Sequence, residues 1–258
     1  MTRLLIDIGN TRIKGCIAED KELGIVQSKN YIKTEFEKEF INFLNLFSNL
    51  SLGKDFIDRN PAGIIPLYIS NLDNGTRGII LSAAKDYEIH FVNAGIQLPI
   101  KIDYANTLGS DRICSAAGAY GKFSEKENIL IIDFGTATTF NIVSKGVYSG
   151  GMISTGIKTS ADALINKTTL PDVTLNKDIR LINKDTDSAI ISGLIFQQVL
   201  FVRKAIEEYK NLFKELYVVA TGGGLDLIKN HETGIDIFEP YLVLEGLNFI
   251  GIYNETIR

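Results

Sequence analysis

The chain contains few of the side chains on which zinc sites and catalytic triads depend. Its 258 residues include only two cysteines and two histidines. Cys16, Cys114, His90 and His231 are isolated from one another, without the short spacings that metal ligands need. The sequence therefore disfavours a zinc centre and a Ser-His-Asp triad. We expect the two cysteines to be reduced thiols, as is usual in the cytoplasm.

The sequence also lacks the features of nucleic-acid and membrane binding. The formal net charge is −4, and no dense cluster of Lys and Arg is present, so no nucleic-acid partner is expected. No unbroken apolar run approaches the roughly 18 residues of a membrane span, and no signal peptide is visible. Hydrophobic residues make up 45% of the chain and charged residues 22%, which is ordinary for a soluble globular protein. We therefore expect a cytoplasmic protein with no membrane partner.

What the chain does contain is one phrase that occurs twice. Residues 4–11 read LLIDIGNT and residues 130–137 read LIIDFGTA. Asp7 and Asp133 are 133 − 7 = 126 residues apart, about half of the chain, whereas solenoid repeats have periods of roughly 20–50 residues. The repeat therefore indicates two similar tandem domains, which we place at 1–115 and 116–258. No linker rich in Pro, Gly or Ser separates them, so a tight interface is expected.

The hydrophobic pattern predicts strands that alternate with helices. Strands are expected at 4–8, 13–18, 63–70, 88–92, 129–133, 138–143 and 216–220. Helices are expected at 35–50, 78–86, 113–120, within 186–213, and from 225 onward. Pro66 predicts an irregular or edge position for its strand, because proline cannot donate to a sheet. This order of elements indicates an α/β fold of mixed sheets covered by helices.

The first copy of the phrase has the chemistry of a phosphate site. Gly9 allows a positive φ angle, and its missing Cβ lets a phosphate approach the backbone. Asn10 and Thr11 offer hydrogen-bond donors, and Asp7 at the strand end can bind Mg²⁺. A plain β-hairpin turn is the alternative, since Gly-Asn is a favoured turn dipeptide. The recurrence of the acid and the glycine in the second copy favours phosphate binding.

Two further motifs point to the same chemistry. Residues Thr221–Gly224 place glycines after an apolar strand, which permits close approach by a flat or anionic ligand; they match neither a Walker A loop nor a dinucleotide fingerprint. Residues Gly109–Arg112 precede a predicted helix of small residues. Asp111 near that helix N-terminus is favoured as an ionised base for phosphoryl transfer. Arg112 can pair with a substrate carboxylate, although a surface ion pair is the alternative.

Taken together, these motifs resemble the acetate-kinase/sugar-kinase/heat-shock-70/actin superfamily and, within it, the type III pantothenate kinases. The ordered phrases that carry the resemblance span nearly the whole chain and are 7–11, 109–112, 133–139, 150–153, 168–171, 185–186, 191–193 and 221–223. Each phrase is weak alone, whereas the ordered set is specific. The resemblance implies two tandem ribonuclease-H-like domains, with mixed sheets flanked by helices, around a nucleotide cleft.

The resemblance also implies an activity, which is the ATP-dependent phosphorylation of pantothenate to 4'-phosphopantothenate in the first step of coenzyme A biosynthesis. Asp111 is then the general base. The implied pantothenate contacts are Gly109, Ser110, Asp111, Arg112 and Thr186. The implied ATP contacts are Asp7, Ile8, Gly9, Asn10, Thr11, Arg12, Ile13, Lys14, Thr136, Gly222 and Gly223. The implied metal sites are Asp7 for Mg²⁺ and Asp133 for a monovalent cation, K⁺ or NH₄⁺.

The family also implies a homodimer, in which Thr186 contacts pantothenate from the partner subunit. The predicted helix around 196–209 is a candidate interface, with an ordinary core helix as the equal alternative.

Three positions depart from the family pattern. Thr155 stands where a proline is common, and Ser110 stands where an alanine is more usual. Ile102 occupies the place of a pantothenate-contacting tyrosine, with Tyr104 two residues further on.

Two other functions remain open from the sequence. One is a kinase of another small hydroxy substrate in the same superfamily. The other is a non-catalytic nucleotide-binding regulator of the accessory transcription factor type. The presence of Asp7, Asp111 and Asp133 argues against a regulator, because a protein that only binds has no need of a base.

Overall fold

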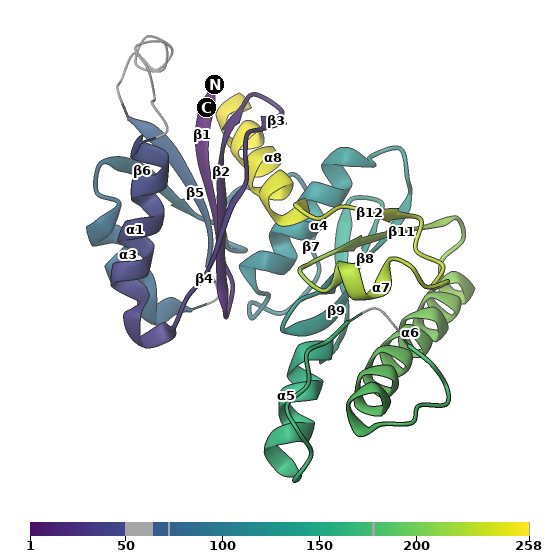
Figure 1. The fold of residues 1–258 in the computed structure, drawn as a ribbon. Coiled ribbons are helices and arrows are strands. Elements are labelled where there is room, and N and C mark those ends of the chain that lie inside the picture. The colour runs from purple at the N-terminus through teal and green to yellow at the C-terminus, as the bar shows by residue number, and fades with distance from the viewer. Residues whose placement is uncertain (50–63, 72, 177–178, 258) are drawn as a thin grey trace. The chain divides into compact units, whose positions relative to one another are not determined.

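The computed structural model describes residues 1–49, 64–71, 73–176 and 179–257 (Figure 1). These residues form two mixed sheets flanked by helices, which confirms the predicted α/β class. Two compact units are present. The first comprises Met1–Lys122 together with Leu242–Arg258, and the second comprises Phe123–Tyr241.

The sheet of the first unit begins with a hairpin and continues in parallel. Its strands are β1 (Thr2–Ile8), β2 (Arg12–Glu19), β3 (Glu22–Leu23), β4 (Gln27–Asn30), β5 (Ile65–Asn71) and β6 (Tyr87–Phe91). The short strand β7 (Lys101–Ile102) follows in the chain and is not part of this sheet. The strand order is β3-β2-β1-β5-β6, with β4 also paired to β2. β1 is antiparallel to β2 and parallel to β5, which is parallel to β6. The carboxyl ends of β1 and β5 therefore lie side by side.

Helices cover both faces of this sheet (Figure 1). They are α1 (Phe36–Asn49), α3 (Arg77–Ala83), α4 (Ser110–Lys122) and α8 (Leu242–Thr256), with short 3₁₀ turns η1 (Lys33–Glu35) and η2 (Asn74–Thr76). The aromatic stripe of α1 is buried against β1 and β5, as the interpretation of core packing predicts; its members are Phe36, Phe40, Phe43, Leu44 and Phe47. Helices α4 and α8 pack against each other and also contact the sheet.

The prediction that Pro66 marks an edge or an irregular strand is wrong. β5 has β1 on one side and β6 on the other, so it is an interior strand. Pro66 pairs with Glu88 of β6, whereas the ladder with β1 begins one residue later, at Leu67. The proline is tolerated because it stands near the start of its strand, before the ladder with β1 begins.

The second unit repeats the same plan. Its strands are β8 (Asn128–Phe134), β9 (Ala137–Ser144), β10 (Val147–Thr155), β11 (Leu216–Thr221) and β12 (Ile237–Phe238), in the order β12-β11-β8-β9-β10. β8 forms an antiparallel hairpin with β9 and pairs in parallel with β11. Asp133 is the penultimate residue of β8, as Asp7 is of β1. The repeated phrase therefore marks topologically equivalent positions in the two units.

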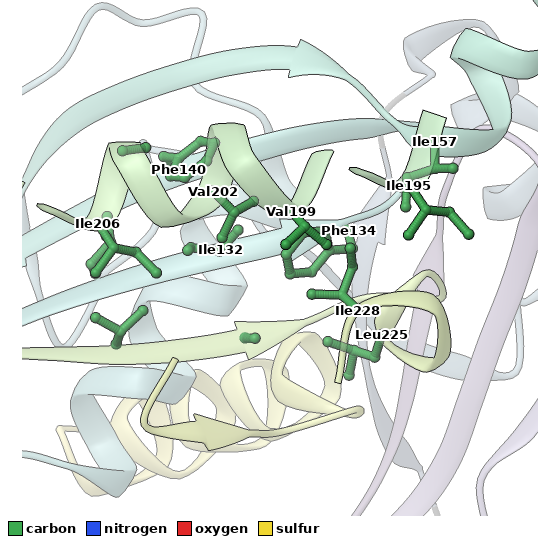
Figure 2. Close-up of a cluster of buried hydrophobic side chains, with 14 of the residues drawn as sticks. Ile132, Phe134, Phe140, Ile157, Ile195, Val199, Val202, Ile206, Leu225 and Ile228 are labelled. Carbon is green, nitrogen blue, oxygen red and sulfur yellow. The ribbon is translucent and has the colours of Figure 1, made fainter. Parts of the chain in front are cut away.

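The core of the second unit forms between its sheet and a long helix. The helices are α5 (Ile157–Lys167), α6 (Thr186–Leu212) and α7 (Leu225–Ile228). Figure 2 shows four α6 side chains directed at the strands, namely Ile195, Val199, Val202 and Ile206. Ile132, Phe134 and Phe140 face them from the sheet.

Within the described part of the chain, α6 is long and apolar enough to cross a membrane by length and composition alone. The search for an unbroken apolar run did not identify α6 as such a helix. Small and amide side chains interrupt the run, although they lower the average hydropathy of the helix only slightly. Half of the most apolar stretch of α6 is buried inside the protein. α6 is therefore the core helix of an α/β unit.

The compact units differ from the predicted division at residue 115. That residue lies inside α4, and the C-terminal α8 belongs to the first unit. Side chains far apart in sequence hold α8 there, since the buried Arg3 guanidinium forms an ion pair with Glu255 and donates to Asn248 Oδ1 at 3.1 Å. Glycines allow α4 and α8 to approach closely, because a Cβ on Gly118 would lie 2.5 Å from the Leu242 carbonyl oxygen.

A methyl group at the α4–α8 contact is expected to destabilise the first unit. A Cβ on Gly246 would overlap the carbonyl oxygen of Cys114 in α4. Gly246→Ala should therefore lower the free energy of unfolding by about 1–3 kcal/mol or more in urea denaturation, since both helices must move apart. Gly193→Ala in α6 is the matched control, because among the described residues no atom outside the neighbouring helix backbone lies within 4 Å of its added Cβ, and it should stabilise by up to about 1 kcal/mol. Equal effects of the two changes would contradict this account of the contact.

Candidate active site

The turn after β1 is a closed β-hairpin turn with exposed polar groups. The Gly9 N–H donates to the Arg12 carbonyl at 3.0 Å. Tyr31 fixes the turn from outside, since its hydroxyl donates to the Gly9 carbonyl at 2.7 Å and its N–H donates to the Thr11 carbonyl at 3.2 Å. Asn10 and Thr11 are exposed. The hairpin interpretation and the phosphate interpretation are thus compatible, because the turn is rigid and leaves its polar groups open.

The residues of the first unit that the family implies for ATP binding divide into exposed and buried ones. Asn10, Thr11 and Arg12 are exposed, whereas Ile8 and Ile13 are buried in the hydrophobic core of the first unit. These two isoleucines can therefore offer a ligand only their backbone. Gly9 does not adopt a positive φ, and an added Cβ would meet only the Arg12 carbonyl oxygen at 3.5 Å. The positive φ angle that the sequence analysis allowed for Gly9 is therefore not adopted.

Asp7 is a buried carboxylate in a mixed electrostatic environment. It stands opposite Lys14 across the hairpin and opposite Ser70 in the parallel strand β5. Burial raises the pKa of Asp7 to about 6, Lys14 lowers this pKa, the charge of Asp111 raises it, and a hydrogen bond from Ser70 lowers it. Its Oδ1 atom is buried and has no hydrogen-bond partner among the residues described. An unsatisfied buried carboxylate oxygen is a natural ligand for a cation.

Asp111 lies in the first turn of α4, next to the end of β5. The Arg112 N–H donates to Asp111 Oδ1 at 2.8 Å. Burial raises the pKa of Asp111 above its usual range, although the Arg112 hydrogen bond and charge lower it. The pKa of Asp111 is therefore shifted in the direction opposite to that expected at a helix N-terminus, because desolvation of the carboxylate outweighs the helix field. A raised pKa makes this carboxylate a stronger base than an exposed aspartate.

The neighbours of Asp111 are also held in place. The Gly109 carbonyl accepts from the Ile113 N–H at 3.1 Å, which starts the helix. The Ser110 hydroxyl lies 3.2 Å from that of Ser70 and is buried. The Arg112 side chain is only 7% exposed, and its guanidinium lies 5.3 Å from the centre of the half-exposed Tyr104 ring. Tyr104 therefore orients a buried arginine beside the candidate base.

The second unit carries its own glycine-lined carboxylate. Asp133 stands in register with Thr139 of β9 and Thr221 of β11. Gly222 has a φ of +102°, and a Cβ on it would overlap Asp133 Oδ1. Only glycine therefore fits beside this carboxylate. Gly223, the next residue, is exposed.

Thr136 is exposed at the turn after β8. Its carbonyl accepts from the Thr159 hydroxyl at 2.6 Å and from the Gly156 N–H at 3.0 Å. Thr186 is the exposed first residue of α6, which Asp185 caps by accepting from the Ser188 N–H at 2.8 Å. Thr136 and Thr186 therefore lie at the ends of secondary-structure elements, where both residues are exposed.

The structure thus brings together Asp7 and Asp111 within the first unit, although they are far apart in the sequence. Thr136, Asp133, Thr186, Gly222 and Gly223 belong to the second unit. Sequence reasoning missed Ser70, Tyr31 and Thr159. The position of Ser70 at the carboxyl end of a predicted strand was the one signal that pointed to it.

Removal of the Asp7 charge is expected to stabilise the fold at high pH. Because its folded-state pKa is about 6, above the ordinary 3.8, the native state binds the proton more tightly than the unfolded state. The contribution of Asp7 to stability is therefore most favourable below about pH 4 and falls as the pH rises through 6. In chelator-containing buffer, Asp7→Asn should gain unfolding free energy relative to wild type between pH 4 and 8, by at most about 3 kcal/mol.

Urea denaturation across this pH range checks the prediction, with the exposed Asp86→Asn as the matched control. A difference between Asp7→Asn and wild type that stays constant with pH would contradict it.

Comparison with known proteins places these sites in a family. The family model described as type III pantothenate kinase matches residues 3–208. A type III pantothenate kinase from Agathobacter rectalis is 30% identical over 262 aligned residues, which cover 96% of this chain and 95% of that protein.

Among solved structures, a protein described as a Baf family transcriptional activator from Campylobacter jejuni aligns with a TM-score of 0.61 and 20% identity over 98% of this chain and 99% of that one. A ROK hexokinase from Thermus thermophilus aligns with a TM-score of 0.51 and 12% identity over 100% of both chains. At these identities the two structures show the fold alone. The family model and the curated relative go further, and the chain belongs to the type III pantothenate kinase family.

Proposed function

We propose that this protein transfers the γ-phosphate of ATP to the primary hydroxyl of pantothenate, in the first step of coenzyme A biosynthesis. Family membership supports the reaction. The structural observation that carries it is that Asp111, at the start of α4, lies close enough to Asp7, at the end of β1, for its charge to raise the pKa of Asp7. A phosphotransferase needs a base for the acceptor hydroxyl and a carboxylate for the cation that accompanies ATP. The family favours pantothenate over another hydroxy substrate, and catalysis over regulation.

Asp111 is the general base of the proposed mechanism. It accepts a hydrogen bond from the substrate hydroxyl, points that oxygen at the γ-phosphate and takes up the proton as the phosphoryl group transfers. Its raised pKa strengthens it as a proton acceptor, and the Arg112 N–H fixes Oδ1. Because the transition state of phosphoryl transfer is loose, positioning and charge neutralisation supply most of the rate enhancement.

Arg112 binds the carboxylate of pantothenate. A guanidinium and a carboxylate match in a two-pronged, charge-assisted hydrogen bond, and burial of Arg112 strengthens that bond by reducing solvent screening. Gly109 and Ser110 complete this side of the site through the backbone at the helix start. Thr186 contributes a hydroxyl to pantothenate from the partner subunit.

The residues that the family implies for ATP binding occur at turns in each unit. In the first unit, Asn10, Thr11 and Arg12 offer exposed donors, and Lys14 offers a cation beside Asp7. In the second unit, Thr136 offers an exposed hydroxyl at the turn after β8, and Gly222 and Gly223 offer backbone without side chains. Such groups bind phosphate oxygens and a flat base through short contacts that side chains would obstruct.

Asp7 fits a role as the Mg²⁺ ligand. Its orphaned Oδ1 atom supplies a hard oxygen donor. No group of three or more His, Cys, Asp or Glu side chains capable of holding a metal occurs among the described residues. This agrees with Mg²⁺ in kinases, which is bound by one or two carboxylates with phosphates and waters. A Mg²⁺ ion held there would supply charge neutralisation during the transfer.

Asp133 fits a role as the ligand of a monovalent cation, K⁺ or NH₄⁺. Its carboxylate lies in a space that Gly222 leaves free, and a Cβ there would fill it. Oxygen donors in such a cradle suit a hard cation.

We also propose that the enzyme is a cytoplasmic homodimer that pairs through α6. Phe196 and Phe201 on this helix are 38% and 36% exposed, although its other face is core. Light scattering after size exclusion tests the proposal, and a monomer of about 28.5 kDa at assay concentration would exclude it.

The proposed reaction predicts an ADP release that depends on pantothenate, Mg²⁺ and K⁺ or NH₄⁺ in a coupled assay. Glucose and acetate should not replace pantothenate. A protein that binds ATP but releases no ADP with pantothenate would favour the regulator.

The assignment of the base predicts that Asp111→Asn lowers kcat by about 10²–10⁴-fold, because the amide cannot take up the hydroxyl proton. ATP affinity should change far less, as measured by fluorescent nucleotide competition. Asp86→Asn, an exposed carboxylate of the same unit, is the matched control and should keep its kcat. Losses of similar size in kcat and ATP affinity would exclude Asp111 as the base.

A further inference from the structure

The Ser70 hydroxyl lies where three elements of the first unit meet. Ser70 is the penultimate residue of β5, in register with Asp7 of β1, and its side chain is fully buried. Its Oγ lies 3.2 Å from the Oγ of Ser110, the first residue of α4. Ser110 is itself only 6% exposed. One buried hydroxyl contact therefore connects the strand end that carries Asp7 to the helix start that carries Asp111.

The contact between the two serines also reaches Asp7. An ionised carboxylate only accepts hydrogen bonds, whereas a serine hydroxyl both donates and accepts. A hydrogen bond from Ser70 lowers the pKa of Asp7, and Ser70 also forms a hydrogen bond with the Cys114 side chain. Either hydroxyl can be the donor in the contact between Ser70 and Ser110. The two hydroxyls therefore belong to one buried network with Asp7, and the members of such a network strengthen one another by polarisation.

Burial and the same contact separate the Ser110 hydroxyl from the substrate. The Ser110 side chain is buried and its hydroxyl lies against Ser70 of β5, so it faces the sheet. Asp111 is the next residue along the helix. A shift of the helix start that moved Asp111 would also break this buried contact and leave polar atoms unsatisfied, which is unfavourable. Small displacements of a catalytic group are costly in rate because the reaction requires a near-attack geometry.

We propose that the Ser70–Ser110 contact is a positioning device that holds Asp111 in its productive place relative to Asp7. The inference rests on the proposed function for the reaction that Asp111 serves. Ser70 and Ser110 are positioning residues, since neither hydroxyl touches the reacting atoms.

A double-mutant cycle in steady-state kinetics tests the proposal. Ser70→Ala and Ser110→Ala should each lower kcat by roughly 3–10-fold, the value of one neutral hydrogen bond. The double variant should be no slower than the slower single variant, because either change alone breaks the contact. The KM values for pantothenate and ATP should stay within about 2-fold of wild type, since ground-state binding is not involved.

Ser115→Ala is the matched control. Ser115 is equally buried in α4, and its hydroxyl donates to the Arg112 carbonyl at 3.2 Å without touching either carboxylate. This variant should keep the kcat of wild type. Circular dichroism and thermal melts establish that all four variants are folded at the assay temperature, so that kcat reports only folded enzyme.

Three results would overturn the inference while wild type is active. Independent losses that multiply in the double variant would show that the two hydroxyls act separately. A raised KM for pantothenate with unchanged kcat in Ser110→Ala would make Ser110 a substrate contact. A loss in Ser115→Ala equal to that in Ser70→Ala would reduce the effect to general packing. Absence of pantothenate-dependent ADP release by wild type would instead overturn the proposed function, and the inference with it.

Discussion

Burial of charge at the end of β1 is the constraint on which the candidate site depends. Asp7 is removed from water, its pKa is raised by burial and by Asp111, and one of its oxygens has no hydrogen-bond partner among the described residues. Such a group weakens the fold unless a ligand satisfies it. Lys14 and Ser70 offset part of this cost. The arrangement places an energetically unfavourable group in the candidate site, a common relation between stability and function.

The two copies of the repeated phrase show how one local structure acquires two different surroundings. Asp7 and Asp133 occupy the same position in a hairpin that is extended by a parallel strand. The residue opposite the carboxylate in that parallel strand differs between the two units. Ser70 lies opposite Asp7 and contacts Ser110, the residue before Asp111. Thr221 lies opposite Asp133, and an added Cβ on the next residue, Gly222, would overlap the Asp133 carboxylate. The neighbouring parallel strand therefore sets the surroundings of each carboxylate.

Much of the fold could be predicted from local pattern. Short apolar runs that end in Asp-x-Gly were recognisable as strands, and the aromatic spacing of 36–47 was recognisable as a buried helix face. The position of Pro66 and the membership of α8 could not be predicted in the same way. Both depend on which distant segments pair, through the register of β1 with β5 and through the contact of Arg3 with Glu255. Neither partner is identifiable from the sequence around the residue itself.

For the candidate site, the sequence alone determined the types of residue and their order, because phosphate chemistry needs acids, glycines and hydroxyls at strand ends. It predicted Asp7 and Asp111 as site residues, and it indicated the family of the chain. Only the tertiary structure decided the electrostatics, since desolvation reversed the direction expected for the pKa of Asp111. Only the tertiary structure brought Ser70 beside Asp7 and Ser110. The physical reason is that burial and hydrogen-bond partners depend on packing between distant segments, whereas residue chemistry is carried by each side chain.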